Sequence, residues 1–126
     1  MRKILAVVFA LTLSGCAGFQ LLSGTSVPPT AVYVAVNSFD AVEATATNYL
    51  RLKKCSPTSG SVCRSPTATA KIIPAVRSGR VARTNLEQFY KDNPGALGPA
   101  SLYNALVTAT STLNGIMQAY NIGATQ

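Results

Sequence analysis

Apolar residues recur at spacings of three and four residues along three separate stretches of the chain. This spacing places them on one face of an α-helix and leaves the other face polar. The first stretch predicts a helix that begins at Ser26 or Val27 and ends near Lys54. Pro28 and Pro29 suit its first turn, where a missing N–H costs nothing. Its apolar stripe consists of Val32, Ala35, Val36, Phe39, Val42, Ala46, Tyr49 and Leu50.

The second stretch predicts a helix that begins near Ser65-Pro66 and ends near Asp92, where Asn93-Pro94-Gly95 stops it. Pro74 leaves two alternatives at this point, because it either kinks the helix or marks its true first turn. The inner face of this helix consists of Ile72, Ala75, Val76, Gly79, Ala82, Leu86, Phe89 and Tyr90.

The third stretch has the most regular pattern and predicts a helix from Pro99 that Gly123 closes. Its stripe, with alternating spacings of four and three, consists of Leu102, Leu106, Ala109, Leu113, Ile116 and Tyr120, widened by Ala105 and Met117. Tyr103 and Val107 fall outside this stripe, so we expect them to point away from the core.

Three amphipathic helices with short connections predict an all-α fold. The specific expectation is a small antiparallel, up-down-up three-helix bundle that occupies residues 27–126. Strict alternation of apolar and polar residues is nowhere sustained, and this argues against an extended β-structure.

The segment before the first helix has the layout of an export signal. A basic start at Arg2 and Lys3 precedes the apolar run from Ile4 to Leu13, and small residues follow. A run of about ten apolar residues is too short to cross a bilayer. We therefore predict that residues 1–15 are a cleaved signal peptide and that residues 16–26 are a tether to the helical domain.

The end of this signal, Leu13-Ser14-Gly15-Cys16, resembles the lipobox of bacterial lipoproteins. The resemblance implies that the Cys16 thiol receives a diacylglycerol, that cleavage makes Cys16 the mature N-terminus, and that its amine is acylated. No other cofactor is expected. Ala17 stands where Asp often retains lipoproteins in the inner membrane, so the resemblance implies the periplasmic face of the outer membrane. The alternative is an ordinary signal peptide with a chance cysteine.

The remaining cysteines, Cys55 and Cys63, form an even pair in a chain that is expected to enter an oxidising compartment. We predict that they form a disulfide in the first helix–helix loop, which stabilises the fold by roughly 2–3 kcal/mol. The alternative, free thiols or half of a metal site, would need further ligands, and the chain has no His.

Composition narrows the range of activities. The 126 residues contain no His and no Trp, and 11 basic residues against 4 acidic ones give a net charge of +7. Without His, and with carboxylates that show no close pairing in the sequence, we assign no catalytic site and expect no enzyme. We also expect no nucleic-acid partner, because the lipid anchor places the chain in the envelope and no nucleic-acid motif is present.

The second helix offers a candidate binding surface. Arg77, Arg80, Arg83 and Lys91 fall on one side of it, together with Glu87. A basic edge near a membrane suggests contact with lipid phosphate or an acidic glycan. The alternative, which we favour, is a solvated face organised by Arg83–Glu87 and Glu87–Lys91 pairs at a spacing of four.

Two further features bear on partners. The small residues Gly79, Ala82, Ala105 and Ala109 allow either close packing inside the bundle or self-association. Tyr33 and Tyr103 lie off their stripes and are candidates to anchor a partner. No motif in the sequence identifies that partner.

These observations favour a membrane-anchored, non-enzymatic lipoprotein that binds an envelope protein or another copy of itself. The layout is also loosely similar to small lipoproteins of bacteria and their prophages whose functions are unknown, so a superinfection-exclusion or lysis-associated lipoprotein is an alternative. A small lipid- or ligand-binding module is a second alternative, although so small a bundle has little room for a pocket.

Overall fold

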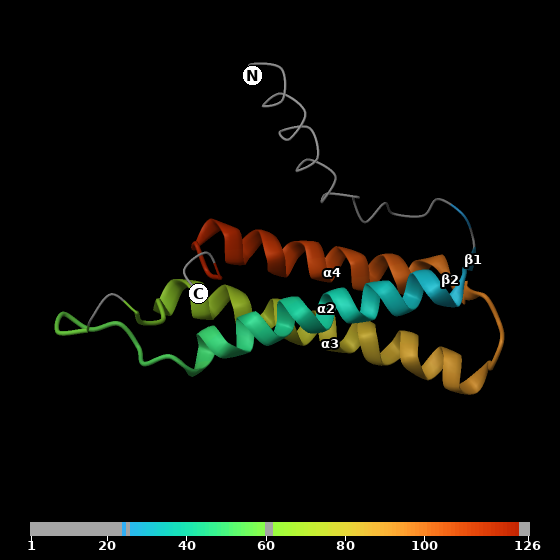
Figure 1. Cartoon of the computed structure of the whole chain (residues 1–126), viewed down its shortest axis with the longest axis horizontal. Coiled ribbons are helices and arrows are strands. Elements are labelled where there is room, and N and C mark those ends of the chain that lie inside the picture. Colours follow the sequence, from blue (N-terminus) through green and yellow to red (C-terminus); the bar gives the residue numbers. More distant parts are fainter. Residues whose placement is uncertain (1–23, 25, 60–61, 124–126) are drawn as a thin grey trace, which may run out of the picture.

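The computed structural model describes residue 24, residues 26–59 and residues 62–123. It confirms the all-α prediction: α2 (Pro29–Arg51), α3 (Pro66–Asp92) and α4 (Ala100–Ala119) lie side by side and alternate in direction (Figure 1). The α2–α3 loop lies at one end of the bundle. The α3–α4 connection lies at the other end, together with the short strands β1 (Ser26–Val27) and β2 (Gly98–Pro99).

Helix α2 is shorter than predicted at both ends. It begins at Pro29 because Ser26 and Val27 instead pair with β2 in an antiparallel register. It ends at Arg51, since Leu52 adopts an extended conformation with ψ of 152°. The Lys53-Lys54 dipeptide, which the sequence placed in the last turn, therefore lies beyond the helix.

Helix α3 begins where the sequence predicted. The Ser65 hydroxyl oxygen accepts a hydrogen bond from the Ala68 N–H, and Pro66 occupies the first turn. Pro74 lies inside the helix, so of the two alternatives the helix starts before Pro74 rather than at it. The helix ends at Asp92, as expected.

Helix α4 buries a wider face than predicted: Leu106, Ala109, Leu113 and Met117 are buried as expected, and further residues beside them are buried too. Tyr103 and Val107 are buried, which corrects the expectation that they point outward, whereas Ile116 and Tyr120 are only half-buried. The reason is that α4 packs against both α2 and α3, so its buried arc is wider than a two-helix seam. The same packing encloses Thr110.

The end of α4 is formed by Asn121 rather than by Gly123. Asn121 has φ of 53°, and its N–H donates to the Gln118 carbonyl. The N–H of Ile122 donates to the Met117 carbonyl at 2.8 Å. These two bonds form a Schellman motif, in which Asn takes the left-handed position that glycine usually occupies.

The centre of the bundle is a contact between α2 and α3. The ring of Phe39, which is fully buried, lies directly over Gly79. A side chain at position 79 would overlap the ring, so the absence of a Cβ allows the two helices to approach. Gly79, Ala82 and Ala109 are buried, and this supports the interpretation of these three small residues as core positions. Ala105 is exposed, so the expectation that it widens the buried stripe of α4 is wrong.

The β1–β2 pair attaches Ser26 and Val27, which precede α2, to the bundle. Val27 is fully buried, and its carbonyl accepts a hydrogen bond from the Tyr90 hydroxyl at 3.3 Å. Gly98 lies against the same hydroxyl. The predicted signal peptide and tether, residues 1–26, lie outside the described residues except for Gly24 and Ser26.

Candidate functional site

The predicted lipidation site, Cys16, lies outside the described residues. In the part of the chain that the structure describes, no helix has the length and apolar character needed to cross a membrane. Within the same residues, no three His, Cys, Asp or Glu side chains gather as a metal site would require.

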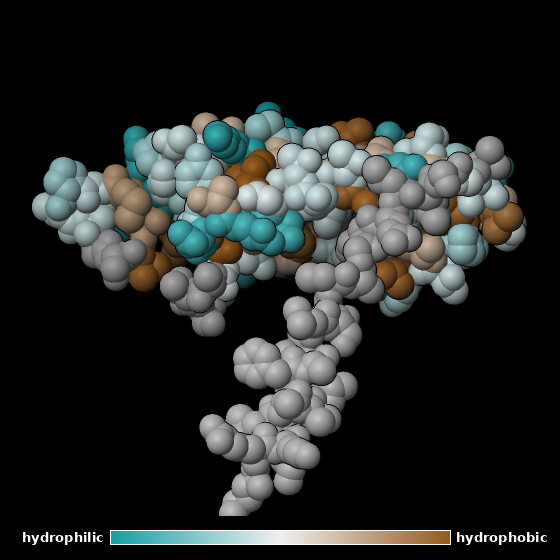
Figure 2. Space-filling model, turned by 90° about the horizontal axis from the view of Figure 1, so that it is seen from above, coloured by the Kyte–Doolittle hydropathy of each residue, from teal (hydrophilic) through white to brown (hydrophobic). Residues whose placement is uncertain are grey.

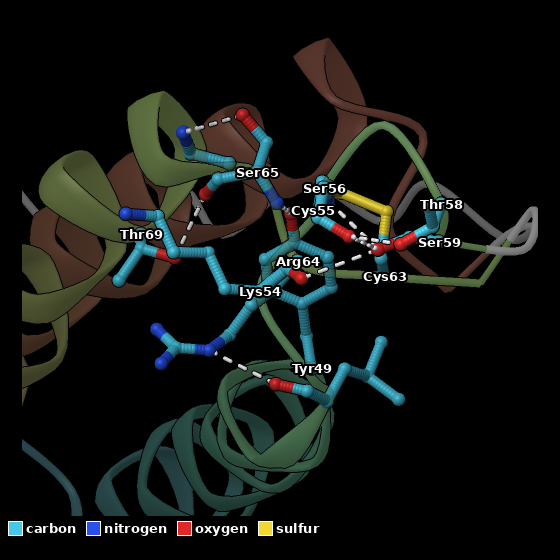
Figure 3. Close-up of a disulfide and its surroundings, with 12 residues drawn as sticks. Tyr49, Lys54, Cys55, Ser56, Thr58, Ser59, Cys63, Arg64, Ser65 and Thr69 are labelled. Atoms are coloured by element: carbon cyan, nitrogen blue, oxygen red, sulfur yellow. Dashed lines mark hydrogen bonds between the residues drawn. A yellow bond between two sulfur atoms is a disulfide. The ribbon is translucent and has the colours of Figure 1, made fainter.

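The predicted disulfide is present. Cys55 and Cys63 are joined across the α2–α3 loop, with their Cα atoms 5.0 Å apart and a sequence separation of eight. Next to the disulfide, the Arg64 N–H donates to the Lys53 carbonyl at 2.9 Å, and the Cys55 N–H donates to the Arg64 carbonyl at 3.1 Å. The disulfide and these backbone bonds fix both sides of the loop (Figure 3).

Two side chains connect this loop to the helices. The Ser65 N–H donates to the Tyr49 hydroxyl of α2 at 2.6 Å. The Arg64 Nε donates to the Leu52 carbonyl at 2.9 Å, so its guanidinium turns back toward the end of α2 (Figure 3). A positive group at the carboxyl end of a helix is favoured by the helix dipole.

The predicted basic edge of α3 divides into paired and unpaired residues. Arg80 forms an ion pair with Glu43 of α2 at 2.6 Å, and Arg83 contacts Glu87 at 2.9 Å. Arg77 and Lys91 are exposed, and neither belongs to an ion pair among the described residues. Half of the predicted anion-binding edge therefore contacts carboxylates. Of the two pairs that the solvated-face interpretation expects, Arg83–Glu87 forms, whereas Glu87–Lys91 is not among the ion pairs of the described residues.

Arg83 also brings two carboxylates together. Its guanidinium lies 3.2 Å from Asp40 of α2 and 2.9 Å from Glu87 of its own helix. The Asp40 oxygen is buried and, at this geometry, makes an ion-pair contact rather than a hydrogen bond. The arrangement is an interhelical ion-pair network in which a cation separates the two acids, unlike the carboxylate pair of an acid–base site.

An apolar groove lies between α2 and α3 at the β1 end of the bundle. Its volume is about 620 Å³, and it is lined by Pro29, Val32, Tyr33, Val36, Glu87, Tyr90 and Lys91. Tyr33 is 70% exposed, which confirms its predicted outward position, whereas Tyr103 is 6% exposed and is not available to a partner. Val34 and Leu97 are also exposed near this end.

A second groove, between α3 and α4, has a different character. Its volume is about 410 Å³, and small polar and alanine side chains line it, including Ala105. Across the face in Figure 2, apolar residues form separate small patches among hydrophilic ones rather than one continuous apolar surface. The α2–α3 groove is therefore the better candidate for recognising an apolar group.

The fold assembles one group of residues that no local sequence pattern predicted. Five basic residues gather at the disulfide end of the bundle, and we call this group the basic cap: Arg51, Lys53, Lys54, Arg64 and Lys71. The signal that identifies it is the absence of any Asp or Glu between Glu43 and Glu87.

No protein-family model matches the sequence, and no curated protein or solved structure matches it. A function is therefore inferred from the residues of this chain and their arrangement.

Proposed function

We propose that this protein is a lipoprotein of the bacterial cell envelope, anchored through Cys16 at the periplasmic face of the outer membrane, with a non-enzymatic binding role. The observation that carries the proposal is the sequence Leu13-Ser14-Gly15-Cys16 after a basic start and an apolar run. Two or three acyl chains, at about 0.8 kcal/mol per buried methylene, hold such a protein stably on its membrane.

Two features of the fold support this proposal. The Cys55–Cys63 disulfide is the kind of bond that persists in an oxidising, extracytoplasmic compartment. The groove beside the exposed Tyr33 is mostly apolar, and this favours binding of a partner over catalysis.

The anchor is tested by mass spectrometry of the protein purified from bacterial membranes. We expect loss of residues 1–15 and an acylated diacylglyceryl group on Cys16. Cys16→Ser should carry no lipid, and no mature form of it should be recovered with the membranes. A double variant, Cys55→Ser with Cys63→Ser, is the matched control because it loses two thiols but keeps the lipobox. An unmodified Cys16 in a fully soluble mature chain would refute the anchor.

The binding role is tested by cross-linking in cells, followed by affinity capture of the native chain and of Cys16→Ser. An envelope protein captured only with the native chain supports an anchored interaction protein. Cross-links between copies alone would assign a structural, homo-oligomeric role. Resistance of expressing cells to phage infection, lost in Cys16→Ser, would favour the superinfection-exclusion alternative.

The α2–α3 groove favours a second candidate function, the binding of a single acyl chain with an anionic head group. The groove is lined largely by apolar side chains, and Lys91 lies at its edge, where its ammonium can pair with a carboxylate or phosphate. Binding of a fluorescent fatty acid, weakened by Val36→Asp and unchanged by Val81→Asp on an exposed surface of α3, would support it. Equal binding by both variants would exclude this site.

A further inference from the structure

The net charge of the bundle is confined to one end. Nine basic and four acidic residues follow Cys16, an excess of five positive charges. The four basic residues outside the basic cap all lie on α3, and the four acidic residues balance them. The whole excess therefore belongs to the cap.

No acidic side chain on a neighbouring element compensates the cap. Helix α2 has no acid after Glu43, α3 has none before Glu87, and α4 has no charged residue. None of the ion pairs among the described residues involves the cap. Its one aromatic contact is weak, with the Lys71 ammonium 5.8 Å from the centre of the Tyr120 ring.

The backbone of the cap is held in place. Lys53 and Cys55, the neighbours of Lys54 in the chain, are each joined to Arg64 by a backbone hydrogen bond beside the Cys55–Cys63 disulfide, so Lys54 faces Arg64. Arg64 is half-buried against the end of α2, whereas Arg51, Lys53, Lys54 and Lys71 are exposed. Because the backbone that carries these charges is already ordered, binding loses less backbone entropy than it would with the same charges on a free chain, and the surface binds more tightly.

The loop beyond the cap protrudes, and an aliphatic side chain is exposed among its polar residues. Val62, next to Cys63, is 74% exposed, and the loop that carries it extends past the ends of the helices (Figure 1). A convex end that combines an exposed aliphatic side chain with surrounding lysines and arginines fits a flat, anionic, partly apolar surface. We propose that the basic cap binds the surface of an anionic phospholipid bilayer, with Val62 at the headgroup level.

This inference deepens the proposed function and rests on it for the nearness of a membrane. An acidic polysaccharide would also attract the charge of the cap, but it offers no apolar region for the exposed Val62. The nearness of a membrane, which the acyl anchor implies, favours a bilayer over an acidic protein. The proposed contact is separate from the acyl anchor, so either proposal can be refuted without the other. The mass of the peptide that contains Cys16 tests the anchor, and binding of an unlipidated chain to vesicles tests the cap.

The experiment uses residues 16–126 with Cys16→Ser, exported behind an ordinary signal peptide so that the disulfide forms and no lipid is attached. Co-sedimentation is measured with phosphatidylcholine vesicles that contain phosphatidylglycerol and with phosphatidylcholine alone. We expect binding to the anionic vesicles that falls as salt is raised. Lys53→Gln with Lys54→Gln should weaken it about 25-fold, from roughly fivefold for each lysine.

The matched control is Arg77→Gln with Arg80→Gln, which removes the same charge from exposed positions outside the cap and outside the α2–α3 groove. Both double variants are checked for unchanged helical content and melting temperature. We expect the control to lose less than about threefold. Val62→Ser should weaken binding to vesicles while leaving binding to heparin, a soluble polyanion, unchanged.

Three results would overturn the proposal. Equal losses in the two double variants would show that binding follows net charge and not the cap. No binding to anionic vesicles, or equal binding to neutral ones, would exclude a phospholipid surface. Cap-dependent binding to heparin without binding to vesicles would reassign the cap to an acidic polymer.

Discussion

The contact between Phe39 and Gly79 allows a direct test of the helix packing. In an exposed helix position, replacing Gly with Ala stabilises a protein by about 1 kcal/mol, because Ala loses less backbone entropy on folding. Gly79→Ala should do the opposite. Its new Cβ would fall on three ring atoms of Phe39, and that ring is fully buried and has no route to solvent.

The expected size follows from two opposing terms. Overpacking of a core costs about 1–3 kcal/mol, and overlap with several atoms of an enclosed ring belongs at the upper end of that range. Subtracting the gain of about 1 kcal/mol in helix propensity leaves a net loss of about 2 kcal/mol. For a domain of this size, such a loss lowers the melting temperature by about 10 °C.

Gly115→Ala is the matched control. Gly115 lies exposed on α4, and no atom approaches within 4 Å of the place where its Cβ would be. We expect it to stabilise by about 1 kcal/mol, so that urea unfolding followed by circular dichroism separates the two alanine variants by about 3 kcal/mol. Phe39→Leu in the Gly79→Ala background should recover at least about 1 kcal/mol of that difference.

The reasoning would be refuted if Gly79→Ala and Gly115→Ala stabilised the protein equally. That result would mean that the Phe39 ring does not lie over position 79 and that α2 and α3 pack in another register. Absence of coupling between positions 39 and 79 in the double variant would lead to the same conclusion.

Three further predictions concern the ends of the helices. Replacing Cys55 and Cys63 together by Ser should lower the free energy of unfolding by about 2.5 kcal/mol, the loop-closure estimate for a separation of eight residues. An unchanged free energy of unfolding in urea titrations would show that the disulfide does not constrain the unfolded chain. Tyr49→Phe removes the acceptor of the half-buried Ser65 N–H and should cost about 1 kcal/mol, measured by thermal unfolding. Asn121→Ala places Cβ in the left-handed region without the side chain that tolerates it, and should cost about 1 kcal/mol, whereas Asn121→Gly should not destabilise.

Much of the fold was predictable because its signals are local. Pro66 after Ser65, and the Asn93-Pro94-Gly95 stop, act through the backbone of their own neighbours, and the structure confirms both helix ends. The limits of α2 were not predictable in the same way. They depend on the pairing of β1 with Gly98–Pro99 and on the backbone bonds beside the disulfide, and in both cases the partner is distant in sequence.

The buried face of α4 shows a second limit of periodicity. Spacing gives the direction in which the apolar residues point, but not the number of helices that cover them. Tyr103 and Val107 were assigned to solvent because a seam with one partner leaves them outside. A helix that contacts two neighbours buries a wider arc, and the apolar character of both side chains is consistent with that arc.

The charges on α3 show a third limit. The Arg83–Glu87 pair lies at a spacing of four within one helix, so the sequence predicted it. The pairs of Arg80 with Glu43 and of Arg83 with Asp40 depend on how α2 is rotated against α3, which no local pattern contains. Those pairs compensate Arg80 and Arg83, whereas the basic residues of the cap have no acidic residue near them in sequence.

The position of the cap also constrains how an anchored molecule is oriented. Helix α2 has 23 residues and is about 35 Å long, and it separates the entry of the chain at β1 from the cap. Ten residues between Cys16 and Ser26 reach at most about 35 Å when extended. An upright bundle with the cap pointing away would hold the cap at least a helix length from the bilayer, and one with the cap pointing toward it would need the tether fully extended. Lying along the bilayer brings the cap to it without that extension. The acyl anchor and the cap, acting together, favour a molecule whose long axis is parallel to the membrane.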